Sequence, residues 1–554
     1  MLTRRAFHLS LLATAATAAL APDALRARTT TADPVETFLN RLTFGATPLE
    51  RAIVAERGTS GWLEDQLNLS AYDDAFEAGL ARQTLRIAYE AEDDDGEGNS
   101  WGALDEMRPL GTLAADPADL LHLIDWERGF AWEERVRPAN EVIAASLTRA
   151  VHAPAQLREV MTQFWHDHFN VHAHKDEYTA IFFPSYDRML RANALGNFRA
   201  MLGAVATSPT MLVYLNNDDS RASPANENYA RELLELHTLG AANYLNEHAN
   251  RWDEVEKDAS GLAVGYIDED VYEVARAFTG WTVGDGRWVA DGQHAPMTGR
   301  FHYVDSWHDP YQKRVLGREM APNRAPLADG EQVLDVLATH PATARFICEK
   351  IARRLLADDP DPALIQRLAD VFVTHAQAPD QIAQVIRTLV ADPAFAAPPT
   401  KLRRPFEFMA ALYRASGAKI AAPEAAFHWQ LQRAGWQQHT YPPPTGHPDR
   451  AHDWTSSTMI LRMVETAVYA HDDWFGNATT RLSDKLPEGV ATYGDLITHW
   501  DTRMFGAPQS GPAPLLAGID VAVDEPLPMD AGSRHDLSAI VLAFAAISPA
   551  FLYR

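Results

Sequence analysis

Apolar residues recur at helical spacing through most of this chain, and this periodicity is the strongest constraint on its fold. The first such stretch, residues 35–69, carries apolar side chains that are repeatedly three or four positions apart. The same pattern returns in further segments: 75–91, 120–132, 139–151, 155–168, 186–193, 197–206, 227–240, 268–280, 331–414, 456–470, 493–504 and 535–547. No repeat of fixed period is present. The sequence therefore predicts a mainly α, multi-helix globular protein.

The helical pattern is interrupted between residues 281 and 316. Residues 281–289 contain the two-residue turn signature of a hairpin, and residues 301–304 and 314–316 are short β-like runs. We expect a small β-hairpin insertion here. The mature chain, 28–554, is then a single large, mostly helical domain. Sub-domains at 28–280 and 329–554, joined by the β-rich insert 281–328, are the natural division of it.

The first 27 residues have the features of an export signal. Arg4 and Arg5 stand before Phe7, as in the twin-arginine pattern, and the apolar run 9–21 is too short for a membrane span. We expect cleavage after Ala27, although an ordinary secretory signal stays open as an alternative. The predicted route is the twin-arginine translocation machinery. The predicted destination is the periplasm or the exterior, with no stable transmembrane segment after processing.

Charge and motif content exclude several function classes. The net charge is -26, from 75 acidic and 49 basic residues, and such a field repels phosphate backbones, so nucleic acid is not an expected partner. No Gly-rich phosphate loop, Gly-x-Ser-x-Gly elbow or paired cysteine motif occurs. Cys348 is the only cysteine, so no intramolecular disulfide forms, which suits a protein that folds before export.

The densest group of metal-binding side chains lies in residues 166–174, which contain His166, His168, His172 and His174. A continued helix would place His168 and His172 on one face, whereas His166 would lie about 200° from His168. An extended chain would instead align His172 with His174. Such a set suits one divalent transition metal such as zinc. The alternative is a set of hydrogen-bonded histidines beside an aromatic core, since no standard ligand spacing is present.

The helix expected from Glu227 carries a second group of reactive side chains. Glu227, Arg231 and Glu235 form an i, i+4, i+8 ladder, which is typical of a paired structural network. Glu232 and Glu235 are the candidate catalytic residues, as a general base or as metal ligands.

Two loops supply candidate binding residues. Trp307, His308 and Asp309 lie in the β-rich insert, where aromatic and polar side chains suit a sugar or peptide surface, although a fixed turn is the favoured interpretation of this segment. Three successive prolines in residues 438–448 impose an extended, rigid loop, and Arg450 and Trp454 follow it. That loop would either wall a pocket or strap helices together.

Several segments together resemble one known family. They are residues 164–171 (Phe-Trp-His-Asp-His-Phe-Asn-Val), 211–216, 227–240, 274–281 (Val-Ala-Arg-Ala-Phe-Thr-Gly-Trp), 307–310, 315–317, 340–347 and 443–448 (Pro-Pro-Thr-Gly-His-Pro). Their order resembles the bacterial exported family known as domain of unknown function 1800. The resemblance implies an exported, mainly helical protein and a partner from the exported unknown-function family 1501. It carries over no catalytic residues. His168 and Lys175 fit the family pattern, whereas His166, His172 and His174 depart from it.

Two functions from different classes follow. One is a helical scaffold or accessory subunit that works with a partner at the cell envelope. The alternative is a metal-dependent periplasmic hydrolase that acts on envelope or extracellular polymers, with a metal-activated water and a glutamate that moves protons. The absence of any mechanistic motif favours the first.

Overall fold

The structure, a computed structural model, describes residues 33–554 apart from 69–70, 94–99, 126, 291, 424, 472–480, 509–515 and 517–520. The predicted export signal, residues 1–27, lies outside the described residues. Helices dominate the described chain and the strands form only short antiparallel pairs, which confirms the mainly α prediction. None of the described helices combines the length and apolar character that a membrane span requires.

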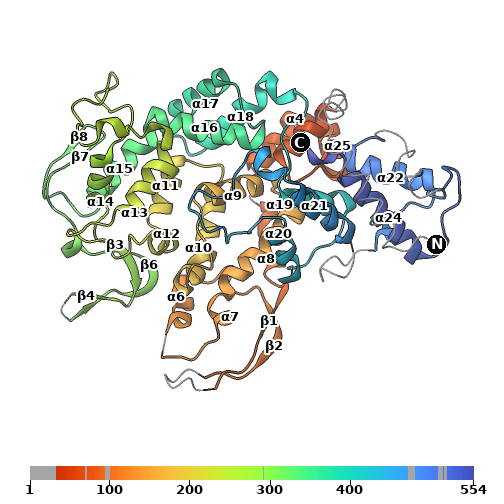
Figure 1. Cartoon of the computed structure of the whole chain (residues 1–554), viewed down its shortest axis with the longest axis horizontal. Coiled ribbons are helices and arrows are strands. Elements are labelled where there is room, and N and C mark those ends of the chain that lie inside the picture. The colour runs from red at the N-terminus through yellow and green to blue at the C-terminus, as the bar shows by residue number, and fades with distance from the viewer. Residues whose placement is uncertain are drawn as a thin grey trace.

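The helices of the first half surround α9, which lies near the centre of the molecule (Figure 1). Their bounds are α3 (Pro34–Leu42), α4 (Pro48–Asn68), α5 (Ala71–Leu80), α6 (Pro117–Leu120), α7 (Trp132–Arg135), α8 (Arg137–His152), α9 (Gln156–His168), α10 (Glu177–Asn193), α11 (Phe198–Ala206), α12 (Pro209–Tyr214), α13 (Glu227–Glu232), the π-helix η3 (Leu233–Thr238) and α14 (Asp268–Ala277).

The helices of the second half extend along both sides of this centre (Figure 1). They are α15 (Ala328–Thr339), α16 (Pro341–Leu355), α17 (Pro362–Thr374), α18 (Gln381–Ala391), α19 (Pro405–Ser416), α20 (Ala425–Arg433), α21 (Ser457–Tyr469), α22 (Tyr493–Phe505), α24 (Ala531–Ala546) and α25 (Pro549–Leu552). Many begin with proline after a capping residue. Asp361, for example, accepts a hydrogen bond from the Ala363 backbone N–H at 2.9 Å.

The strands of the described residues pair in four short antiparallel sets. They are β1 (Thr84–Tyr89) with β2 (Leu104–Pro109), β3 (Trp281–Asp285) with β6 (Met297–Tyr303), β4 (Trp288–Ala290) with β5 (Gln293–His294), and β7 (Lys313–Val315) with β8 (Arg318–Met320). The predicted β insertion is therefore present.

Two local predictions were wrong. The turn at residues 285–288 does not join a hairpin of its own flanking strands, because β3 pairs with β6 and the β4–β5 hairpin is nested between them. The helix predicted over 75–91 ends at Leu80, and the chain then forms β1. The cause in the second case is tertiary, since β1 gains a full set of backbone partners from β2, about 20 residues further along.

The proline-rich segment, residues 437–449 and here called the proline strap, lies across the end of α9. The Asn170 side-chain amide donates to the carbonyls of Tyr441 and Pro443, at 2.9 and 2.8 Å. The Ala173 backbone N–H donates to the His439 carbonyl at 2.8 Å. Because the prolines hold the strap extended, these bonds fix its distance from α9.

Gly446 is the point of closest approach between the proline strap and α9. Its φ is +70°, and a Cβ there would lie 1.9 Å from the Asp167 carbonyl oxygen. Only glycine fits both requirements. The motif at 443–448 and the motif at 164–171 are therefore in direct backbone contact.

Gly446→Ala is expected to lower the free energy of unfolding by about 2–5 kcal/mol, from a left-handed backbone and a backbone clash. Urea denaturation at neutral pH measures it. Gly261→Ala is the matched control, because Gly261 has φ +80° and no atom within 4 Å of its would-be Cβ. That variant is expected to lose only about 1–2 kcal/mol. Equal losses in the two variants would contradict the close-contact role of Gly446.

Candidate functional site

A pocket of about 520 Å³ lies between α9, α16, the start of α19 and the proline strap. Its walls are Phe164, Asp167, His168, Lys350, Arg353, Arg354, Arg404, Tyr441, Thr445, Gly446, His447, Pro448, Asp449, Arg450 and Asp453. Five of these side chains are cationic and three are carboxylates, an excess of two positive charges in a chain of net charge -26. The wall of the pocket is therefore richer in positive than in negative side chains, although the chain as a whole is acidic.

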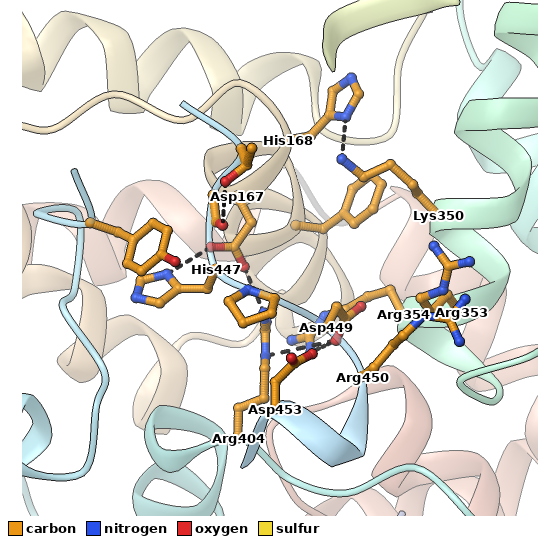
Figure 2. Close-up of a pocket in the computed structure, with 15 residues that line it drawn as sticks. Asp167, His168, Lys350, Arg353, Arg354, Arg404, His447, Asp449, Arg450 and Asp453 are labelled. Atoms are coloured by element: carbon orange, nitrogen blue, oxygen red, sulfur yellow. Dashed lines mark hydrogen bonds and ion pairs between the residues drawn. The ribbon is translucent and has the colours of Figure 1, made fainter. Parts of the chain in front are cut away.

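Helix α16 presents three of the cations to the pocket. Lys350, Arg353 and Arg354 stand at positions i, i+3 and i+4, so they share one helical face. They also occupy the last turns of α16, where the helix dipole favours positive charge. Figure 2 shows Arg353 and Arg354 reaching the pocket from this helix, on the side opposite His447.

A single buried carboxylate, Glu407, organises the floor behind these cations. It pairs with Arg354, with Arg404 at 2.8 Å and with Arg554 at 3.3 Å, and all four side chains are buried. Burial raises the pKa of Glu407, but the three guanidinium groups outweigh it and hold that pKa well below its ordinary value. Three positive charges thus share Glu407, and Asp449 lies 3.9 Å from two of them, Arg354 and Arg404.

Asp167 connects the α9 wall to the proline strap. Its carboxylate accepts from the Arg404 guanidinium at 2.9 Å and from His447 Nδ1 at 3.1 Å. The Gln437 backbone N–H donates to His447 Nε2 at 3.1 Å, so His447 is neutral and its Nδ1 carries the proton. Burial raises the pKa of Asp167, but Arg404 and His447 lower it further than burial raises it. With both nitrogens used, His447 holds the strap and is not available as a base.

Lys350 differs from the other cations of the pocket in its partners. Its Nζ lies 2.9 Å from His168 Nδ1, and no carboxylate of the described residues forms an ion pair with it. His168 Nε2 donates to the His237 carbonyl at 3.1 Å, near the end of the π-helix η3, so His168 Nδ1 must be the acceptor for Lys350. Figure 2 shows this pair at the upper edge of the pocket.

The electrostatics of this pair follow from its burial. Burial lowers the pKa of Lys350 to about 8, and Asp167 and Asp449 oppose that shift without cancelling it. Burial, followed by the charge of Lys350, lowers the pKa of His168 well below its ordinary value. His168 is therefore a neutral acceptor at neutral pH. Lys350 offers its remaining N–H groups to whatever enters the pocket.

The four histidines predicted as metal ligands separate in the structure. His168 faces Lys350, whereas His166 donates to Asp187 on α10 across 3.0 Å. Because α9 ends at His168, His172 and His174 lie on the following turn, with ring centroids 6.5 Å apart. Among the described residues, no three His, Cys, Asp or Glu side chains come together as a metal-binding group. Metal binding stays a prediction, and His168 would have to give up a protein partner to take part.

The predicted catalytic glutamates lie outside the pocket walls. Glu232 closes α13 and Glu235 lies in η3, and neither forms an ion pair with a described residue. Burial, then the charge of Glu235, raises the pKa of Glu232. The predicted ladder is present only in part, because Arg231 approaches Glu227 at 3.9 Å and also Asp268 at 3.7 Å. His237 also lies in η3, and its backbone carbonyl accepts the hydrogen bond from His168. This bond is its link to the pocket.

The predicted binding residues of the β insertion hold structure together. Trp307 is buried and its indole N–H donates to the Val289 carbonyl at 3.0 Å. His308 approaches Asp329 at 3.2 Å, and Asp309 pairs with Arg276 at 2.8 Å. None of the three lines the pocket.

The two predicted binding residues after the proline strap have different places. Arg450 lines the pocket and pairs with Asp359 at its rim. Trp454 is buried behind the strap, where its indole N–H donates to the Pro448 carbonyl at 2.9 Å. Arg450 is thus the predicted residue, besides His168, that the structure places at the pocket.

Sequence reasoning missed Lys350, Arg354, Arg404 and Glu407. A signal was available, because basic residues gather at 350–354 and 401–404 in an otherwise strongly acidic chain. What the sequence could not show is that these two groups face each other, since two further α-helices, α17 and α18, separate α16 from α19 along the chain.

The comparisons with known proteins give one match. The model of the family described as "Protein of unknown function (DUF1800)" matches residues 37–553. No curated protein and no solved structure matches the chain.

Glu407→Gln is expected to lower the free energy of unfolding by about 3–5 kcal/mol, because three buried guanidinium groups lose their shared counter-charge. Chemical denaturation at pH 7 measures it. The pKa of Glu407 is depressed by folding, so its stabilisation is present above its unfolded pKa and is lost as the pH falls. The difference between wild type and variant should therefore narrow below about pH 4.

The matched control is Glu331→Gln. The Glu331 side chain is 48% exposed, and its carboxylate pairs with Arg199. An exposed pair contributes at most about 1 kcal/mol. A loss of that size in Glu407→Gln as well would contradict the organising role of Glu407.

Proposed function

The chain belongs to the DUF1800 family of proteins of unknown function, and from that premise we propose that it is an exported accessory protein that binds an anionic group in the cationic pocket. The family match confirms the resemblance seen in the sequence motifs. The anionic group would be a carboxylate, phosphate or sulfate carried by a small molecule or by the end of a polymer. The activity is retention and presentation of this group at the cell envelope.

The observation that carries the proposal is the unpaired ammonium of Lys350. Buried or half-buried cations are normally matched by carboxylates, as Lys313 is by Asp329 at 2.8 Å. Lys350 has instead a neutral histidine and the face of the Phe346 ring, whose centroid lies 5.3 Å from Nζ, and neither carries a negative charge. A bound anion would supply the missing counter-charge through charge-assisted hydrogen bonds, each contributing about 1.5–3 kcal/mol.

The surrounding guanidinium groups make the pocket selective for anions. Arg404 and Arg354 are held rigidly by Glu407, so their orientation is set before a ligand arrives. Guanidinium groups bind oxyanions in two-point contacts, and preorganised ones lose little conformational entropy on binding. The aromatic walls, Phe164 and Tyr441, suit an apolar body attached to the anion.

Metal-dependent hydrolysis, the alternative function, has weaker support. It needs a ligand set and a glutamate near the same water, whereas His166, His168 and the pair Glu232 and Glu235 have separate surroundings. The described side chains favour binding of an anion over binding of a cation at the pocket.

Location and partner are parts of the same proposal. The twin-arginine features of residues 1–27 support export to the periplasm or beyond, and the family resemblance supports a partner from the unknown-function family 1501. A protein that presents a bound anion to a second exported protein has no need of a catalytic motif of its own.

Sulfate tests the pocket directly, because its charge is constant between pH 6 and 10. Titration calorimetry of the mature protein should show saturable sulfate binding at pH 7. Lys350→Met should weaken it about 10- to 100-fold, the equivalent of one charge-assisted hydrogen bond. The affinity should also fall as the pH rises through about 8, where Lys350 loses its proton.

Arg345→Met is the control for the sulfate titration, because Arg345 is exposed on the same helix and does not line the pocket. It should leave the sulfate affinity within about twofold, since an exposed charge acts weakly through screened solvent. Equal weakening by both variants, or no saturable binding by the wild type, would refute the proposal.

Export is tested by the double substitution Arg4→Lys with Arg5→Lys. Precursor should accumulate in the cytoplasm, because twin-arginine substrates are selected through the paired arginines. Immunoblots of cytoplasmic and periplasmic fractions measure this. Arg26→Lys, which keeps the paired arginines, should be exported normally. Normal export of the double variant would rule out the twin-arginine route.

A further inference from the structure

The hydrogen bonds of His168 determine how the Lys350 amine can be oriented. His168 Nε2–H is committed to the His237 carbonyl, so its Nδ1 presents only a lone pair. Lys350 must therefore direct an N–H toward Nδ1, at 2.9 Å, in both of its protonation states. When the amine is neutral, its own lone pair cannot face His168. It is available on the side of the pocket.

Burial of Lys350 favours the neutral amine, against the opposing charges of Asp167 and Asp449. Arg353 is one turn further along α16, and no carboxylate of the described residues pairs with Lys350 to hold its proton. An adjacent cation and a desolvated setting are the means by which proteins make lysine nucleophilic. The lowered pKa, about 8, agrees with this setting.

Other buried or bonded lysines lack this combination. Lys401 pairs with Asp358 at 2.7 Å and with Asp449 at 3.2 Å, and Lys313 pairs with Asp329. Lys175 is exposed and donates to the Val213 and Tyr214 carbonyls. Among these, Lys350 alone combines a pocket, a neutral acceptor and cationic neighbours.

We propose that Lys350 is a nucleophile that forms an imine with a small carbonyl-bearing anion, an aldehydic or keto acid, whose charged group is held by the guanidinium groups of the pocket. This inference rests on the proposed function, because the anion is what brings the carbonyl group to the amine. It deepens that function by naming the class of ligand and a covalent mode of retention.

The step balances without any added oxidant or reductant. The neutral amine attacks the carbonyl carbon, a C–N bond forms, and the carbonyl oxygen takes up a proton to give a carbinolamine. The oxygen then leaves as water, which carries away the two hydrogens of the amine overall. A C=N bond to Lys350 remains, and hydrolysis reverses every step. His168 acts as a positioning residue, since it holds one N–H and leaves the lone pair free.

The test is reductive alkylation of the intact mature protein with glyoxylate and sodium cyanoborohydride at pH 7.5. Cyanoborohydride supplies hydride to the imine and makes the adduct permanent, so peptide mass spectrometry gives the rate at each lysine. At this pH about a quarter of an amine with pKa 8 is neutral, against about 0.1% of an ordinary lysine. Lys350 should be modified at least about 10-fold faster than exposed Lys257.

Acetaldehyde is the matched probe, because it has the carbonyl group and lacks the carboxylate. It should modify Lys350 faster than Lys257, but about 10-fold more slowly than glyoxylate does, if the guanidinium groups hold the anion. Prior saturation with sulfate should slow the glyoxylate reaction at Lys350 and leave Lys257 unchanged.

Failure of the two proposals is distinguishable. Modification of Lys350 no faster than Lys257 with either aldehyde would overturn the nucleophile, even where sulfate binds. If glyoxylate and acetaldehyde both modify Lys350 fast and at the same rate, the amine is reactive, but the proposal that the guanidinium groups hold the carboxylate of the ligand is overturned. Because the wild-type protein is used throughout, no result depends on whether a variant folds.

Discussion

The buried pairing of three arginines with Glu407 is the interaction on which the rest of the centre depends. Arg354 comes from α16, Arg404 from the start of α19, and Arg554 lies beyond α25, so one carboxylate joins three distant parts of the chain. A buried charge left without a partner costs several kcal/mol, and this cost specifies one arrangement of these elements. Arg354 and Arg404 of this cluster also form part of the wall of the pocket.

The proline strap completes what the charge cluster begins. Its prolines keep it extended, and Gly446 lets it touch the α9 backbone. Both ring nitrogens of His447 form hydrogen bonds that hold it there. Asp167 is shared between the strap and Arg404, so the wall of the pocket and its floor are one hydrogen-bonded unit. Rigidity of this kind favours binding of a small charged group, since little entropy is lost when it enters.

The sequence predicted much of the fold and little of the site. Helical periodicity located most helices, and the change of pattern after residue 281 located the β insertion. Prediction from the sequence failed where the structure of a segment depends on which other strand is available to pair with it. β3 pairs with β6 across a nested hairpin, and β1 replaces the end of a predicted helix because β2 is available to it. At the site, only His168 and Arg450 of the predicted residues reach the pocket, since the end of α9 at His168 separates it from His172.

Composition and residue spacing by themselves determined the helical class, the lack of an intramolecular disulfide, the rigid loop at the prolines and the acidic character of the chain. These properties depend only on which residues the chain contains and on their neighbours along the sequence. Tertiary structure alone decided which charges are paired. It set three arginines on one glutamate, gave Lys350 a neutral histidine in place of a carboxylate, and turned an acidic protein into one with a cationic pocket. The reason is that electrostatic energy depends on distance in space, and residues 167, 350, 404 and 447 approach one another only after the chain has folded.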